Sequence, residues 1–411
     1  MIRLYGRAIL TAALLLIFSA CADTTPYTGP SYRPVAIPHA ADVDYRLMLL
    51  GDAGDDDLGT DASQPVLRRL ERELARSPIR TTVVFLGDIV YEHGYPADGD
   101  PSTREQAQRR LSSQLRATRT ADAIFVPGNH DWDAGKEHGW DNVRELGRVV
   151  DQYARESGER ARVLPAGGCP GPVGVPLGRR LLLVVLDTQW WLHQHAKPSE
   201  DDNPTGCAQW TESAVLSELR NLLLEARRDN RQVVLASHHP MRSHGPHGGF
   251  FDWRAQIFPI TMYARWAWLP LPGIGSIVTF WRSHQSWMHQ DFSNPAYAHL
   301  RQSFAAALND AALQGLAPLA HAAGHEHSLQ VLQDEKSDVF TLVSGLGSAH
   351  QIMHVTHDDD TLFSHSNANR PGLMELRFLT DGRGHLSVLE ADPAGSGFEA
   401  VFTTWLQRDR S

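Results

Sequence analysis

The stretch T-V-V-F-L-G-D-I-V-Y, residues Thr82–Tyr91, decides the fold that we predict for this chain. Its first five residues are apolar or β-branched, which is typical of a parallel strand buried on both faces. Gly87 then predicts a turn, so Asp88 and Tyr91 follow the carboxyl end of the strand. Taken alone, this pattern is better explained by an Asp that caps a turn. Ligands bind at this edge of open α/β sheets, however, and similar segments elsewhere in the chain favour a chemical role.

Apolar runs and amphipathic stretches alternate on both sides of this strand. Predicted strands and helices follow one another at 46–50, 64–75, 82–86, 102–115 and 123–126. This β-α-β-α-β order favours a mostly parallel sheet with helices on its faces. Further core strands are expected at 181–186 and 232–237, joined by an amphipathic helix over 211–228. Beyond residue 329, short apolar runs separated by turns predict a second, largely antiparallel sheet.

The composition is that of a folded, acidic protein. The chain has 411 residues, of which 42 % are hydrophobic and 21 % charged, so it can bury a large core and is not a disordered segment. Its formal net charge of −10 argues against non-specific binding to nucleic acid, and we expect no nucleic-acid partner.

The first 20 residues predict a targeting segment. Two arginines precede an apolar run, Ala8–Phe18, which is too short to span a bilayer as a stable helix. The run ends in F-S-A-C, which resembles a bacterial lipobox with Cys21 as the lipidated residue, and ordinary signal-peptide cleavage near Ala20–Ala22 is the alternative. The resemblance implies an exported lipoprotein of the outer membrane facing the periplasm, or else a soluble periplasmic or secreted protein. Residues 21–44 are then expected to form a tether.

Export places the chain in an oxidising compartment. If Cys21 carries lipid, Cys169 and Cys207 remain as one possible disulfide pair, and each lies beside Gly or Pro in a loop-like sequence.

An aromatic-rich insertion is expected at about 248–300. Its segment Phe250–Trp281 contains few charges, but Arg265 and several prolines argue against a membrane-spanning helix. Two interpretations stay open. The insertion is either an extra buried hairpin or loop cover, or an aromatic surface, residues 258–281, that lies in the headgroup zone of a membrane.

Five strand ends carry residue types that bind metals. The full set is Asp52, Asp88, Tyr91, Asn129, His130, His238, His325 and His327. Each motif alone occurs by chance in many chains, but five in this order, each after an apolar run, are a strong signal. One Asp can bridge two ions through its two oxygens, and Asp88 on the central strand is our candidate. Two close ions activate a water and stabilise both the attacking and the leaving oxygen of an in-line displacement.

These motifs resemble the calcineurin-like metallophosphoesterase superfamily and, within it, the purple acid phosphatases of the small tartrate-resistant type. The quoted matches are G-D-A-G at 51–54, G-D-I-V-Y at 87–91, P-G-N-H-D at 127–131, L-D-T at 186–188, S-H-H-P at 237–240, H-G-P at 244–246 and G-H-E-H-S-L-Q-V-L-Q-D-E at 324–335. The superfamily commonly has D-x-H first, whereas Gly54 stands at that His position here and Tyr91 is added, as in the purple subgroup. The fold that the resemblance implies is α/β, a four-layer α-β-β-α sandwich.

The resemblance also implies two metal ions. A ferric ion is held by Asp52, Asp88, Tyr91 and His327, and a divalent ion (Fe, Zn or Mn) by Asp88, Asn129, His238 and His325. A phenolate oxygen suits Fe(III) better than an imidazole does.

Several nearby residues have less certain roles. The resemblance places His130 over the substrate phosphoryl group and makes His244 the candidate acid for the leaving group. Because His244 follows the preceding motif at a short spacing, His247 competes with it. We interpret His239 as pointing away from the site and Asp131 as orienting its neighbours.

The activity implied for the single catalytic domain, residues 45–411, is hydrolysis of a phosphorylated small molecule or protein. A hydroxide held by the metals attacks the phosphorus of a phosphomonoester in line. Two alternatives stay open. One is phosphodiesterase or nucleotide pyrophosphatase chemistry at the same site, and the other is a non-catalytic, lipid-anchored envelope protein.

Overall fold

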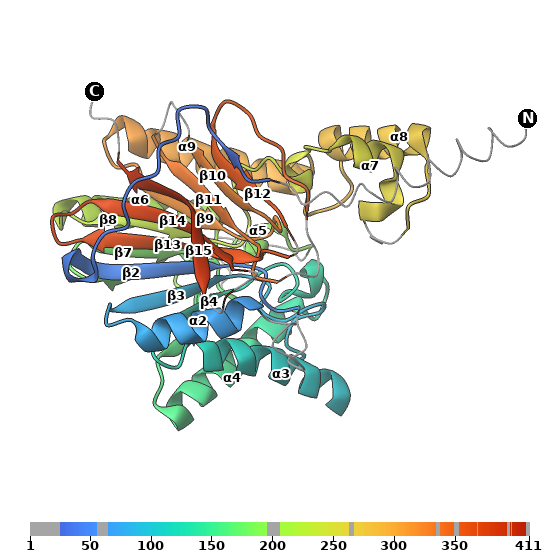
Figure 1. Cartoon of the computed structure of the whole chain (residues 1–411). Helices are drawn as coiled ribbons and strands as arrows, with labels where there is room; N and C mark the ends of the chain where they lie inside the picture. The colour runs from blue at the N-terminus through green and yellow to red at the C-terminus, as the bar shows by residue number, and fades with distance from the viewer. Residues whose placement is uncertain are drawn as a thin grey trace, which may run out of the picture.

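The computed structural model describes residues 25–55, 65–194, 206–262, 267–333, 338–348, 353–367, 369–392, 395 and 397–407. These residues form two β-sheets that pack face to face, with helices on the outer faces (Figure 1). The predicted α/β, four-layer α-β-β-α sandwich is therefore the observed architecture. The predicted targeting segment, with Cys21, lies outside the described residues.

The first sheet is built around the strand from which the fold was predicted. All six residues of β3 (Thr81–Leu86) are buried, and β3 pairs in parallel with β2 (Val43–Leu50) and β4 (Asp122–Val126). The strand order is β15-β14-β13-β2-β3-β4-β5, in which the outer strands are β5 (Ala161–Val163), β13 (Gly372–Leu379), β14 (Gly384–Ala391) and β15 (Phe398–Leu406).

The second sheet has the order β1-β12-β10-β11-β9-β8-β7-β6. Its centre is parallel from β7 through β8 and β9 to β11, and its outer pairs are antiparallel. The strands are β1 (Tyr27–Thr28), β6 (Val173–Leu177), β7 (Leu181–Val185), β8 (Gln232–Ala236), β9 (Ala320–Ala323), β10 (Leu329–Gln333), β11 (Phe340–Ser344) and β12 (Thr361–His365).

The prediction of a separate, largely antiparallel sheet beyond residue 329 is wrong. The C-terminal strands divide between the two sheets, since β10, β11 and β12 join the second and β13, β14 and β15 extend the first. Each sheet therefore has a parallel centre, made by strand–helix–strand connections, and an antiparallel edge made by hairpins.

The helices cover the two outer faces. Apolar side chains of α2 (Pro65–Arg76), α3 (Pro101–Ala117) and α4 (Gly139–Ser157) pack on the first sheet. Those of α5 (Gln189–Leu192), α6 (Glu212–Arg228) and α9 (Pro295–Leu313) pack on the second. The sequence sets where these helices begin. Asp100 accepts hydrogen bonds from the backbone N–H groups of Ser102 and Thr103 at the start of α3, and Pro101 at its first position has no N–H to satisfy.

The expected tether does not extend to residue 44. Residues Tyr27–Thr28 form β1 on the edge of the second sheet, and Ala40–Asp42 form a short 3-10 turn, η1, just before β2. Between them the ring of Tyr32 stacks on Phe402 at 4.6 Å, and the N–H of Val35 donates to the hydroxyl of Thr403 over 3.0 Å. The described part of this segment is thus packed on the domain, because its aromatic and β-branched residues find partners on β12 and β15.

The insertion forms a helical hairpin that projects from the body of the domain (Figure 1). Its helices are α7 (Trp253–Ile257) and α8 (Pro272–His284), and the short turns η4 (Pro246–Gly248) and η5 (Pro259–Met262) precede and follow α7. Two other short turns, η2 (Asp133–Gly135) and η3 (Ala166–Gly168), flank α4 and β5. None of the helices in the described parts of the chain has the length and apolar character needed to cross a membrane.

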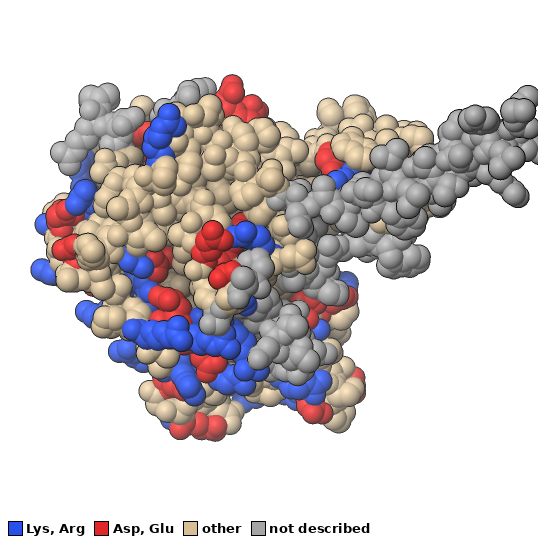
Figure 2. All heavy atoms as spheres, in the orientation of Figure 1, with Lys and Arg blue, Asp and Glu red and all other residues tan. Residues whose placement is uncertain are grey.

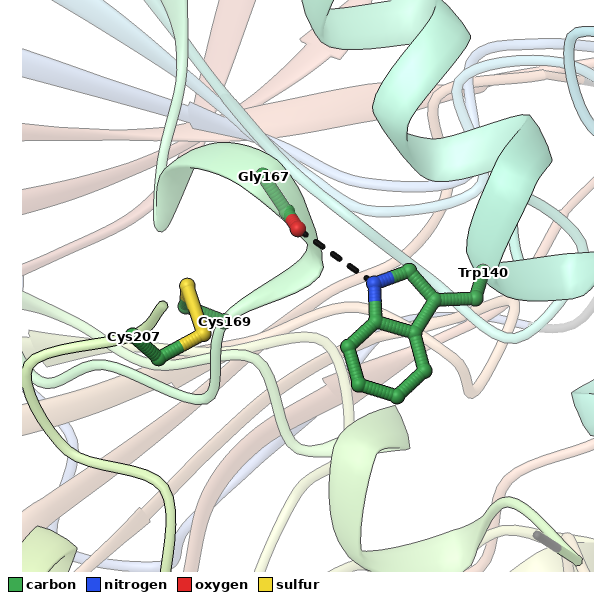
Figure 3. The surroundings of a disulfide bond; sticks show 4 residues. All are labelled: Trp140, Gly167, Cys169 and Cys207. Atoms are coloured by element: carbon green, nitrogen blue, oxygen red, sulfur yellow. Dashed lines mark hydrogen bonds between the residues drawn. A yellow bond between two sulfur atoms is a disulfide. The ribbon is translucent and has the colours of Figure 1, made fainter. Parts of the chain in front are cut away.

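Cys169 and Cys207 form a disulfide, as the sequence predicted (Figure 3). The bond joins the loop after η3 to the segment that leads into α6, across 38 residues of sequence. Beside it, the indole N–H of Trp140 on α4 donates to the carbonyl oxygen of Gly167 over 3.3 Å.

Candidate metal centre

The predicted ligands meet at one edge of the sandwich, where the carboxyl ends of the central strands of both sheets lie. Asp52, Asp88 and Asn129 follow β2, β3 and β4 of the first sheet. His238 and His325 follow β8 and β9 of the second sheet, and the N–H of Gly324 bonds the carbonyl oxygen of His238 over 3.0 Å.

Asp52, Tyr91 and His327 form a first cluster of ligand atoms. The hydroxyl of Tyr91 donates to Oδ1 of Asp52 over 3.2 Å and lies 3.1 Å from Nε2 of His327. The same His327 nitrogen lies 3.3 Å from Oδ1 of Asp52. A carboxylate oxygen of Asp88 lies within 4.8 Å of the Asp52 and His327 atoms. The four residues predicted for the ferric ion therefore lie together, and all are buried.

Asn129, His238 and His325 form a second cluster. The side-chain oxygen of Asn129 lies 2.8 Å from Nε2 of His238 and 3.1 Å from Nδ1 of His325. Oδ1 of Asp88 is 3.5 Å from the same His238 nitrogen. The predicted ligands of the divalent ion are thus also gathered, with Asp88 facing both clusters.

The hydrogen bonds behind the two histidines decide which ring nitrogen faces the cluster. His238 donates from Nδ1 to the carbonyl oxygen of Leu86 over 2.8 Å, and His325 donates from Nε2 to the carbonyl oxygen of Gln290 over 3.1 Å. A carbonyl can only accept, so each partner fixes the tautomer. The lone pairs of His238 Nε2 and His325 Nδ1 are left for a metal, which is the usual arrangement behind histidine ligands.

The backbone is held in an unusual conformation at three of these positions. Asp52, Asp88 and His325 have φ values of 59°, 56° and 70°, in the left-handed region that non-glycine residues rarely adopt. Such conformations cost about 1–3 kcal/mol each and persist where the surroundings impose them, most often at functional sites.

Gly54 explains why the usual His ligand is absent from the first motif. A Cβ at Gly54 would lie 2.2 Å from the carbonyl oxygen of Ile89, because the two loops are joined by hydrogen bonds from Gly54 to Asp88 and from Tyr91 to Gly54. No side chain fits there. The hydroxyl of Tyr91 reaches the first cluster instead.

The acidic oxygens of the two clusters repel one another. Burial, with the charges of Asp88 and Asp52, raises the pKa of Tyr91 well above its ordinary value. Burial and the charge of Asp88 also raise the pKa of Asp131 to about 8. Burial alone would raise the pKa of Asp88 too, but the charges of His238 and His130 hold it below its ordinary value. A buried concentration of negative charge of this kind favours cations.

The residues present fit two metal ions. Metal–ligand bonds of about 2.0–2.2 Å separate neighbouring donor atoms on one ion by about 3 Å. The observed separations of 2.8–3.3 Å around Asn129 and Tyr91 match this spacing. Carboxylate, phenol, amide and imidazole donors together suit iron, zinc or manganese.

His130 and Asp131 support the centre from the loop after β4. The N–H of His130 donates to Oδ1 of Asp88 over 2.9 Å, and its ring lies 4.3 Å from that of Tyr91 and is only partly buried. Asp131 accepts the N–H groups of Ile89, Val90 and Gly128 over 2.8–3.1 Å, so it ties the loops after β3 and β4 together. This is the orienting role expected for Asp131.

The structure brings His247, not His244, to the clusters. The ring of His247 stacks on that of His325 at 4.4 Å, and its Nδ1 bonds Oδ1 of Asp291 at 2.7 Å. His244 instead bonds Asp360 through Nε2 at 2.6 Å and packs against Phe250. The sequence preference for His244 is therefore corrected, because a Gly-Pro turn between the two histidines sends their side chains to different partners.

Sequence reasoning missed several supporting residues. His239 was expected to point away, yet its ring lies 4.6 Å from that of His325, held by Thr188 and Gln290 at 2.8 and 3.0 Å. The chain has already left β8 at this point, so strand alternation does not apply. Gln290 and Asp291 come from the insertion, and no local pattern marks them. Glu326, inside the G-H-E-H motif, is fully buried and accepts the Ser243 hydroxyl and the Gly248 N–H.

Comparison with known proteins agrees with this centre. Residues 45–329 match the family model described as calcineurin-like phosphoesterase, which is more than half of the chain. The chain therefore belongs to the calcineurin-like phosphoesterases, a class whose members include metal-dependent phosphoesterases. A comparison with curated proteins finds no match.

Three solved structures are similar in fold. The chain resembles GAP50, described as the anchor in the inner membrane complex of Plasmodium, with a TM-score of 0.53, 14 % identity and 90 % of each chain covered. A dimetal phosphatase from Danio rerio gives 0.43 and 13 %, over 90 % of this chain and all of the other. A 5'-nucleotidase precursor from Thermus thermophilus gives 0.32 and 12 %, over 89 % of this chain and 54 % of the other. At these identities only the first supports an argument, and that argument concerns the fold.

Proposed function

We propose that this phosphoesterase is a dinuclear phosphomonoesterase of the purple acid phosphatase type. A ferric ion would be held by Asp52, Asp88, Tyr91 and His327, and a divalent iron, zinc or manganese ion by Asp88, Asn129, His238 and His325. When bound, the two ions supply an activated water and the positive charge that phosphoryl oxygens require.

The approach of the Tyr91 hydroxyl to Asp52 and His327, at 3.2 and 3.1 Å, carries this proposal. The close contact of Gly54 with Ile89 excludes a His ligand at the first motif, so the first cluster has a phenol in place of an imidazole. A phenolate is a hard, anionic donor that favours Fe(III) over softer divalent ions. The same substitution distinguishes the purple acid phosphatases from other phosphoesterases in the resemblance drawn above.

The remaining residues of the centre would bind and protonate the substrate. His130, next to Tyr91 and partly exposed, is positioned to donate a hydrogen bond to a phosphoryl oxygen. His247 would act as the general acid for the leaving oxygen. Its Nδ1 is bonded to Asp291, which leaves Nε2 to hold the proton beside His325. Asn129 is a neutral ligand, so it does not repel the incoming phosphate.

We also propose that the domain is exported and anchored through lipid at Cys21. The support is the sequence of the targeting segment and the disulfide, since disulfides persist in oxidising compartments. The substrate would then be a phosphorylated small molecule or protein outside the cytosol.

Hydrolysis assays on two substrates test the activity. We expect the purified, metal-loaded protein to hydrolyse p-nitrophenyl phosphate much faster than bis(p-nitrophenyl) phosphate. Asp88→Ala removes the shared carboxylate and should abolish turnover. Asp381→Ala, at an exposed position in the turn between β13 and β14, is the matched control and should have no effect.

Each alternative has its own outcome in these assays. A preference for the diester would replace the monoesterase with a phosphodiesterase or nucleotide pyrophosphatase. Equal turnover by Asp88→Ala and the parent protein would refute an enzyme at this centre and favour a non-catalytic envelope protein.

A further inference from the structure

Large apolar side chains gather on the outside of the α7–α8 hairpin. Of the eleven large hydrophobic side chains that are exposed among the described residues, nine lie between 250 and 287. We define the outer face of the hairpin by seven of these, each 43–60 % exposed: Trp253, Trp268, Leu269, Ile274, Ile277, Phe280 and Trp281. The described residues from 255 to 281 include no charged residue, and Figure 2 shows the projecting lobe with almost no Lys, Arg, Asp or Glu. Soluble monomers rarely expose an apolar patch of this extent without a partner for it.

Helix α8 has the opposite polarity to a water-facing helix. Its buried residues are Gly275, Thr279 and Arg282, whereas its large apolar residues face outward. In a helix packed on a protein core, the apolar residues take the buried side. The outer face is therefore the side that a nonpolar partner must cover.

The inner contacts of α8 prevent the helix from turning its apolar side inward. A Cβ at Gly275 would lie 1.9 Å from the carbonyl oxygen of Gln256, so α7 lies directly against this residue. Arg282 forms two hydrogen bonds with the fully buried Asp291, at 2.8 and 2.6 Å. These contacts fix the outward direction of the outer face.

The start of the described chain lies on the same side of the molecule as the hairpin. Tyr27 of β1 stacks on His357 at 3.8 Å, in the loop that leads into β12. The same loop approaches α7, since His354 lies 3.5 Å from Arg254. The sequence before β1 contains the apolar run Ala8–Phe18 and Cys21. Six residues separate Cys21 from Tyr27 and reach at most about 20 Å. A membrane attachment there would keep the hairpin close to the bilayer.

We propose that the outer face of the hairpin docks into the headgroup region of a lipid bilayer. Tryptophans beside aliphatic residues are typical of this zone. Helix α8 has 13 residues and is about 20 Å long, which is too short to cross a hydrocarbon core of about 30 Å. It therefore lies in the plane of the membrane. Because the outer face lacks basic residues, binding depends on apolar insertion and not on anionic lipid. This docking is independent of the proposed phosphatase activity.

Photo-crosslinking in the full chain tests this docking. The chain is reconstituted in phosphatidylcholine vesicles with Phe280→benzoylphenylalanine on the outer face. Leu313→benzoylphenylalanine is the matched control, because Leu313 is an apolar residue at the far end of α9 that is 87 % exposed. Both variants share the same N-terminal segment, so any attachment through that segment affects them equally.

We expect lipid adducts at position 280 to exceed those at position 313 by roughly tenfold or more, and to persist in about 1 M salt. Ile277→Ser with Trp281→Ser should reduce the adduct at 280 by roughly tenfold while leaving hydrolysis unchanged. Equal lipid adducts at 280 and 313 would overturn the proposal. Adducts at 280 that join two protein chains would also overturn it and would assign the outer face to a second copy.

Discussion

Replacing Gly128 with alanine tests how closely the loops of the centre must approach each other. Gly128 lies in P-G-N-H-D, directly before the ligand Asn129. A Cβ at this position would lie 2.3 Å from both the backbone nitrogen and Oδ1 of Asp88. Because non-bonded carbon contacts settle near 3.5 Å, either Asp88 or the loop that carries Asn129 must move by roughly 1 Å.

The displacement sets the size of the expected effect. Moving a catalytic group by about 1 Å can cost roughly 100-fold in rate. Inserting one methyl group into a packed site costs about 1–3 kcal/mol of stability, which for a chain of this length lowers Tm by roughly 1–4 °C. We therefore expect Gly128→Ala to lose about 100-fold in kcat/KM and to bind less of both metals, while it remains folded at 25 °C.

Three measurements check this prediction, namely kcat/KM on p-nitrophenyl phosphate, metal content by mass spectrometry and thermal unfolding. Gly147→Ala is the matched control, because Gly147 lies within α4 and an added Cβ would be 4.0 Å from its nearest neighbour, Val163. That change should leave activity intact and stabilise the helix by about 0.5–1 kcal/mol. The reasoning is refuted if Gly128→Ala keeps its metals and its kcat/KM within about threefold of the parent value.

Three further predictions concern the disulfide, a core histidine and the proposed acid. Replacing both Cys169 and Cys207 by alanine should lower the free energy of unfolding by about 3–4 kcal/mol, because the bond closes a loop of 38 residues; unchanged urea midpoints would contradict this. Burial lowers the pKa of His321 to about 4, so as the pH falls from 6.5 towards 4 the unfolded chain gains a proton that the folded protein refuses. We expect His321 to account for a loss of about 3 kcal/mol over that range, and His321→Gln should flatten the pH profile of stability by that amount. His247→Asn should lower kcat by about 100-fold for a phosphomonoester with an alkoxide leaving group and much less for p-nitrophenyl phosphate, whereas equal effects from His244→Asn would return the acid role to His244.

The sequence contained enough information to predict the central fold and the candidate ligands, because both depend on local patterns. A buried apolar run such as Thr82–Leu86, followed by Gly and then Asp, specifies a strand and the side chain at its end. Repeating the pattern five times brings the ligands together, since parallel strands in one layer end at the same edge. Tyr91 was predictable for the same reason, three residues beyond Asp88.

Features that depend on distant partners were not predictable. The C-terminal strands all alternate in the same way, and their division between two sheets is decided by pairing with β2 and β9, far back in the chain. The directions of His244 and His247 depend on Asp360 and Asp291, which are 116 and 44 residues away. Gln290 likewise fixes the His325 tautomer from inside an insertion that has no ligand pattern.

The visible absorption spectrum of the oxidised, metal-loaded protein, measured beside that of Tyr91→Phe, tests the proposed ferric centre most directly. The Tyr91 hydroxyl lies 3.2 Å from Asp52 and 3.1 Å from His327, so an iron ion held by this cluster would bind the phenolate. A tyrosinate–Fe(III) bond gives a broad charge-transfer band, and we expect the parent protein to be purple or pink. The band should disappear in Tyr91→Phe while the variant still folds. A colourless parent protein with a full complement of metal would contradict the ferric assignment and leave a manganese or zinc phosphoesterase in its place.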